Sequence, residues 1–140
     1  MIVALGILAL GACSSDLPGP TVAQAEVTLK ADIDWLMKLI HAKDVKVTNE
    51  GGRNIPCGEG KSRRTYGVIG VSTYSLDDPV STLNMLAGGL IKRGYKVVSA
   101  DPATPRDELV KTESYVRVVT TSPKDKNFAL AGETECLKNS

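Results

Sequence analysis

Residues 21–42, TVAQAEVTLKADIDWLMKLIHA, form the longest amphipathic segment of the chain. Thr21 and Gln24 make the capping-box pattern of a helix start, directly after Pro20. Apolar side chains then recur at helical spacing along one face: Val22, Leu29, Ile33, Leu36 and Ile40. The segment therefore predicts a helix that buries one face, and the rest of the chain must supply an apolar surface for that face.

A second helix is predicted between Pro79 and Gly94. Asp78 suits the N-cap, Pro79 the first helical position and Gly94 the residue after the end. Its apolar face consists of Val80, Leu83, Leu86, Ala87 and Leu90. Gly88 and Gly89 each cost about 1 kcal/mol relative to alanine inside a helix. They therefore indicate either a close packing contact or local mobility.

The remaining segments favour a sheet. Residues 45–48 and 64–75 alternate between the two faces of a strand, and a hairpin is predicted to turn near residues 112–114. Gly67 and Gly70 mark a bulge or a place where a helix packs closely. Residues 55–62 contain a proline and two glycines and are expected to be irregular.

Short turns join most neighbouring strands, which favours antiparallel pairing. The predicted order is α-β-β-α-β-β-β. We expect an α+β fold, a two-layer sandwich in which two amphipathic helices cover one face of a mainly antiparallel sheet.

The N-terminal segment is an uncharged apolar run, Ile2 to Leu10, which ends in Leu10-Gly11-Ala12-Cys13. It is shorter than the roughly 20 apolar residues that span a bilayer and has the length of a signal-peptide core. Leu10-Gly11-Ala12-Cys13 resembles the lipobox of bacterial lipoproteins, in which signal peptidase II cuts before a cysteine that carries a diacylglyceryl group.

This resemblance implies that residues 1–12 are a signal peptide and that Cys13 is the lipidation site. Residues 13–20 would be a flexible tether, and residues 21–140 a single globular domain. The protein would be anchored on the extracytoplasmic side of the cell membrane or the outer membrane. Beyond the signal, the chain is similar to small actinobacterial-type lipoproteins in general layout alone, which identifies no activity.

The chain has three cysteines. If Cys13 carries lipid, Cys57 and Cys136 remain, and in an oxidising compartment we expect them to form a disulfide. A redox-active or metal-binding pair is the alternative, although neither cysteine belongs to a Cys-x-x-Cys motif.

Seventeen basic residues balance sixteen acidic ones, so the charge does not suggest nucleic acid as a partner. We find no motif for catalytic, cofactor-binding or metal-binding residues. His41, the single histidine, is expected to interact with the end of the first helix. Lys61, Arg63 and Arg64 form a small basic cluster. It indicates either a solvated strand edge or a contact with anionic headgroups or an acidic wall polymer.

These observations favour a non-catalytic binding or structural module of the bacterial cell envelope. Its partners would be the membrane, through the lipid anchor, and an envelope protein or polymer. The alternatives are a small envelope enzyme or enzyme inhibitor whose site is assembled from scattered residues, and a carrier for an apolar ligand. A deep pocket with perturbed pKa values would favour an enzyme, and an exposed surface without one would favour partner binding.

Overall fold

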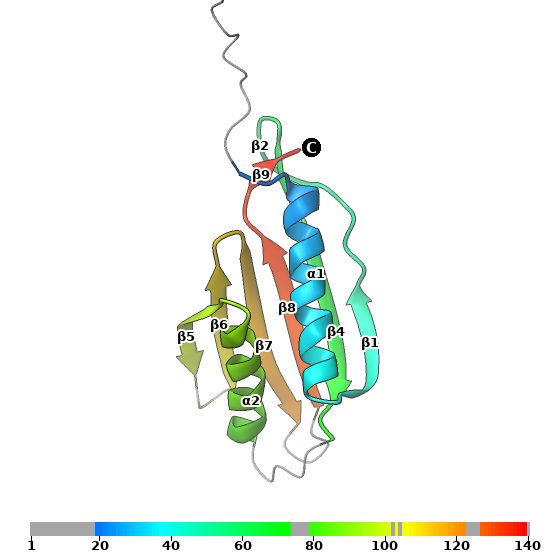
Figure 1. Ribbon diagram of the computed structural model, residues 1–140, viewed down its shortest axis with the longest axis vertical. Coiled ribbons are helices and arrows are strands. Elements are labelled where there is room, and N and C mark those ends of the chain that lie inside the picture. The colour runs from blue at the N-terminus through cyan, green and yellow to red at the C-terminus, as the bar shows by residue number, and fades with distance from the viewer. Residues whose placement is uncertain (1–18, 74–78, 102, 104, 123–126, 140) are drawn as a thin grey trace, which may run out of the picture.

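Two helices lie on one face of a six-stranded antiparallel sheet (Figure 1). The computed structural model describes residues 19–73, 79–101, 103, 105–122 and 127–139. Across the sheet the strands are β1 (Lys43–Asn49), β4 (Thr65–Val71), β8 (Asn127–Thr134), β7 (Ser114–Ser122), β6 (Arg106–Lys111) and β5 (Lys96–Asp101). The predicted α+β sandwich is confirmed, and so is the hairpin near residues 112–114, which joins β6 to β7.

Helix α1 (Val22–Leu39) begins with the predicted capping box. Thr21 Oγ1 accepts a hydrogen bond from the Gln24 N–H, and Gln24 Oε1 accepts one from the Thr21 N–H. The predicted apolar face is buried. His41, which follows the C-cap Ile40, has a left-handed φ of 49°, a conformation that glycine usually supplies at this position.

Helix α2 (Pro79–Lys92) ends as predicted at Gly94, where φ is 96°. The N–H groups of Gly94 and Tyr95 donate to carbonyls of the last turn, which forms a Schellman motif. Asp78, the predicted N-cap, lies outside the described residues, as does the side chain of Val80. The other predicted core residues of this helix are buried: Leu83, Leu86, Ala87 and Leu90.

Two glycines allow α1 to approach its neighbours. A Cβ at Gly89 would overlap Leu36 of α1, whereas a Cβ at Gly88 would meet nothing within 4 Å. A Cβ at Gly132 of β8 would lie 2.8 Å from Leu29 Cδ1. Close packing between the helices therefore explains Gly89, and α1 contacts the sheet at Gly132.

The nearest neighbours of a Cβ added at Gly67 or Gly70 belong to strands rather than to a helix. A Cβ at Gly67 would lie 2.8 Å from Thr48 Oγ1, and a Cβ at Gly70 would lie 2.9 Å from the Phe128 ring. Gly67 pairs with Asn49 where the β1–β4 register shifts. Of the two predicted roles, the irregularity in strand pairing is therefore the one found at Gly67.

The expectation that residues 55–62 are irregular is wrong. They form the hairpin β2 (Ile55–Gly58) and β3 (Lys61–Arg63), and β3 also pairs with β9 (Leu137–Lys138) near the end of the chain. Pro56 is tolerated because β2 is an edge strand of this three-stranded sheet. The pairing with β9 comes from a distant segment, so no local pattern indicates it.

The predicted pairing of Cys57 with Cys136 is confirmed. Their sulfur atoms are 2.08 Å apart, and 79 positions separate them in the sequence. The bond links β2 to the segment just before β9, so it fastens the end of the chain to the small sheet.

Candidate functional site

The face of the large sheet that carries no helix is the candidate binding surface. Strand β7 shows how the sequence builds its two faces. Val116 and Val118 are buried beneath the helices, while Tyr115 and Arg117 alternate with them and lie on the opposite face. The same alternation along β4 and β8 leaves a sheet surface of mixed polarity.

This helix-free face is hollowed at its centre because small residues lie there. Gly67, Ala131 and Arg117 are cross-strand neighbours on β4, β8 and β7, so two small residues stand beside one long side chain. The resulting hollow has a volume of about 680 Å³ and is open to solvent. It is bordered by Thr48, Asn49, Thr65, Tyr115, Arg117 and Glu133.

Both signs of charge are present around the hollow. Arg63 Nε lies 3.6 Å from Glu133 Oε1, and both side chains are about half exposed. Tyr115 is hydrogen-bonded to Glu108; burial together with this carboxylate raises the pKa of the Tyr115 phenol above its usual value of 10.0. Tyr115 therefore keeps its hydroxyl proton at neutral pH.

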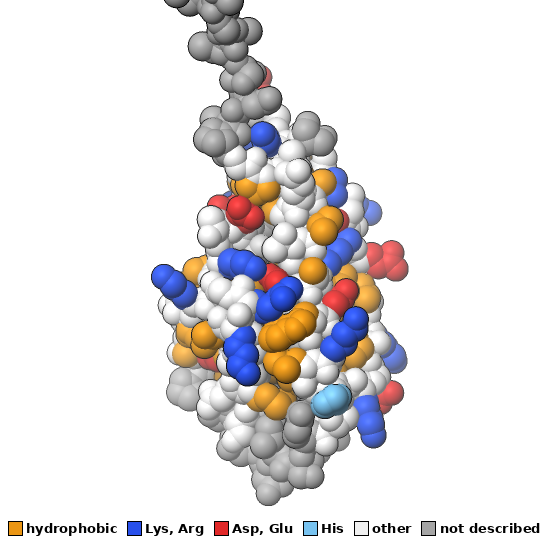
Figure 2. Space-filling model, in the orientation of Figure 1, with side chains coloured by type: hydrophobic (Ala, Val, Ile, Leu, Met, Phe, Trp, Pro, Cys, Tyr) orange, Lys and Arg blue, Asp and Glu red, His pale blue; other side chains and the backbone are white. Residues whose placement is uncertain are grey.

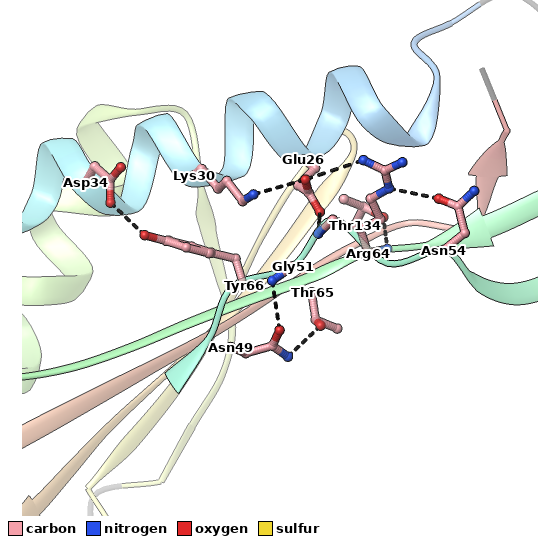
Figure 3. Close-up of polar contacts among 11 residues, drawn as sticks. Glu26, Lys30, Asp34, Asn49, Gly51, Asn54, Arg64, Thr65, Tyr66 and Thr134 are labelled. Carbon is pink, nitrogen blue, oxygen red and sulfur yellow. Dashed lines mark hydrogen bonds and ion pairs between the residues drawn. The ribbon is translucent and has the colours of Figure 1, made fainter. Parts of the chain in front are cut away.

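The Asn49 side chain is fixed in place at the edge of the hollow (Figure 3). Its Nδ2 donates a hydrogen bond of 2.7 Å to Thr65 Oγ1, and its Oδ1 accepts one of 3.0 Å from the Gly51 N–H. Gly51 and Gly52 both have left-handed φ values, which glycine adopts without strain. The Gly52 N–H in turn donates to Glu26 Oε2 over 2.6 Å.

Glu26 is a buried carboxylate of α1 that holds the loop containing Gly51 and Gly52 (Figure 3). Its Oε1 lies 3.1 Å from Lys30 Nζ and 3.4 Å from Arg64 Nη1. Burial alone would raise the pKa of this carboxyl. The Gly52 N–H, Lys30 and Arg64 outweigh it and hold the pKa below its usual value of 4.5.

A second buried carboxylate, Asp32, joins both helices to the sheet. Arg93 Nε lies 2.9 Å from its Oδ1, and Lys111 Nζ and the Tyr95 hydroxyl each lie 3.0 Å from its Oδ2. Burial and the Asp32 charge raise the pKa of Tyr95 far above its usual range. Because several partners satisfy Asp32, we assign this cluster to holding the two layers together.

A smaller hollow of about 310 Å³ lies between the helices and includes Leu39, Met85 and Lys92. On this side of the molecule, Lys and Arg side chains are scattered around apolar ones (Figure 2). Leu39 is 39% exposed here. The apolar residues that form the buried face of α1 do not include Leu39, which lies at the edge of that face.

The structure places the cysteines and basic residues singled out from the sequence in different parts of the molecule. Cys57 and Cys136 come together, and Cys13 lies outside the described residues. Arg64 forms an ion pair with Glu26, whereas Arg63 forms one with Glu133. The predicted basic cluster is therefore divided between two environments.

Sequence reasoning missed Tyr115, Arg117, the buried acid Asp32 and the burial of Glu26. Tyr115 and Arg117 carry a detectable signal, since they alternate with valines along β7. The sequence also contains a signal for the burial of Asp32. It stands next to Ile33 and four residues before Leu36, which places it beside the apolar stripe.

No group of three metal-ligating side chains converges in the described part of the chain. Within the same residues, no helix is long and apolar enough to cross a membrane. No family model, curated protein or solved structure matches this chain.

Proposed function

We propose that the protein is a lipid-anchored, extracytoplasmic binding module of the bacterial cell envelope, without catalytic activity of its own. The observation that carries the binding role is the hollow on the helix-free face. Its volume of about 680 Å³ lies within the range of ligand sites, and its polar groups are held by neighbouring residues.

The proposed anchor rests on the sequence Leu10-Gly11-Ala12-Cys13. Five residues lie between Cys13 and Gly19, and the six steps from Cys13 to Gly19 span at most about 22 Å when extended. The Cys57–Cys136 disulfide suits an oxidising compartment outside the cytoplasm. An anchored domain would thus stay close to the membrane.

We favour a binding role over an enzyme because the hollow is not the deep, enclosed pocket that would favour catalysis. The wide opening of the hollow to solvent also suits a bound surface or chain better than sequestered chemistry.

Replacing Cys13 with alanine tests the anchor. We expect Cys13→Ala to shift the protein out of the membrane fraction, because the thiol that accepts the lipid is absent, while Ser14→Ala remains in it. Fractionation of intact cells, with mass spectrometry of the N-terminal peptide, measures both effects. Membrane association of Cys13→Ala equal to that of the parent chain would refute the anchor.

A further inference from the structure

We propose that the hollow on the helix-free face binds a neutral saccharide chain. This inference rests on the proposed binding role and specifies its ligand. It concerns the surface bordered by Thr48, Asn49, Thr65, Tyr115, Arg117 and Glu133.

The charge around the hollow favours a ligand without net charge. Glu133 and Arg63 form an ion pair across 3.6 Å, and Arg117 stands opposite Glu108 in the neighbouring strand. An anion here would meet carboxylates, and a cation would meet guanidinium groups. A neutral polar ligand avoids the repulsion in both cases and can still use the charged groups as hydrogen-bond partners.

The hydrogen-bonding groups of the hollow match those of a sugar. A sugar hydroxyl both donates and accepts, as do the hydroxyls of Thr48 and Thr65 and the amide of Asn49. The two hydrogen bonds that hold Asn49 leave its amide with a second N–H. Because Asn49 is already positioned, binding costs less conformational entropy than it would for a side chain free to rotate.

Tyr115 supplies the apolar contact that a sugar ring requires. The ring of a saccharide has a face of C–H groups, and an aromatic side chain offers an apolar body with a polar tip. Tyr115 borders the hollow with its hydroxyl held by Glu108. The floor beside it is low and unobstructed because Gly67 and Ala131 are small, so a segment of an extended polymer can lie across the sheet.

Calorimetric titration of the mature protein, purified from membranes in detergent, tests the inference. The probes are three neutral trisaccharides, N,N′,N″-triacetylchitotriose, maltotriose and mannotriose, with tripolyphosphate and spermidine as charged comparisons. We expect saturable binding of at least one trisaccharide and none of the charged probes.

Variants locate the binding at the hollow. Tyr115→Ala and Asn49→Ala should each weaken binding of the trisaccharide at least 10-fold, while Tyr115→Phe, which keeps the ring, should stay within about threefold. Ile69→Ala is the matched control, because Ile69 lies on β4, is 40% exposed and is outside the hollow. Its affinity should equal that of the parent chain.

Absence of binding to all three trisaccharides overturns the inference, as does tighter binding of tripolyphosphate or an equal loss in Ile69→Ala. A photo-reactive residue at position 117 in living cells distinguishes this failure from failure of the proposed function. Crosslinks to polysaccharide support both proposals. Crosslinks to a protein would overturn the saccharide proposal but support the binding role. Crosslinks no more frequent than those from position 69 would overturn both proposals.

Discussion

At the scale of single residues, buried carboxylates organise the loops of this protein. Glu26 lies on α1 with its side chain 6% exposed, yet it accepts the Gly52 N–H and faces two cations. A buried charge is tolerated when it is paired and hydrogen-bonded in this way. Through Gly52, Glu26 holds the loop that fixes Asn49 at the hollow.

We expect Glu26→Gln to lower the free energy of unfolding at pH 7 by about 1–3 kcal/mol, because charge-assisted hydrogen bonds become neutral ones. The folded-state pKa of Glu26 lies below the unfolded value of 4.5. The stabilisation is therefore fully present above pH 4.5 and is lost as the pH falls through the folded-state pKa.

Urea unfolding of the parent chain and of Glu26→Gln measures this difference from pH 7 to pH 3. The gap between the two proteins should narrow on acidification, whereas Glu50→Gln, at an exposed position, should show little effect at any pH. A gap that stays constant across this range would contradict the role of the Glu26 charge.

At the scale of elements, the spacing between the two helices depends on Gly89. This residue contacts Leu36 of α1, while Gly88 beside it faces open space. Both glycines carry the same intrinsic cost in a helix. The tertiary contact alone makes one of them necessary.

The two glycines make a matched pair of variants. We expect Gly88→Ala to raise the free energy of unfolding by up to about 1 kcal/mol, through the better helix propensity of alanine. Gly89→Ala should lower it by about 1–3 kcal/mol, because the added methyl group overpacks the contact with Leu36. Thermal and urea unfolding give both values, and equal effects of the two changes would contradict the contact.

At the scale of the whole molecule, two separate devices hold the fold together. The Asp32 cluster ties α1, the end of α2 and β6 to one another. The Cys57–Cys136 disulfide closes a loop across a separation of 79 residues. It constrains the unfolded chain over most of the domain's length.

Removing the disulfide should therefore be costly. The chain-entropy relation gives about 4.5 kcal/mol for a loop of this size, which is an upper value for the loss in the Cys57→Ser, Cys136→Ser double variant. Melting curves measure the loss, and reduction of the parent chain with dithiothreitol should reproduce it. Two titratable thiols in the unreduced native protein would show that the bond is absent.

The layer architecture followed from local patterns. The capping box at Thr21, the apolar stripe of α1 and the stop at Gly94 each act within a few residues, because helices are determined by spacing and by their ends. The hairpin between β6 and β7 was predicted for the same reason. The small sheet of β2, β3 and β9 was not, since Lys61 and Ser62 pair with residues near the C-terminus.

Local sequence patterns were enough to predict the two amphipathic helices, the α+β class and the pairing of Cys57 with Cys136. Tertiary structure alone decided that Gly67 and Ala131 lie beside Arg117 and open a hollow, and that Glu26 supports the loop behind Asn49. The physical reason is range. Helix spacing and caps act over a few residues, whereas cross-strand neighbours and buried ion pairs join positions that only the register of the sheet brings together.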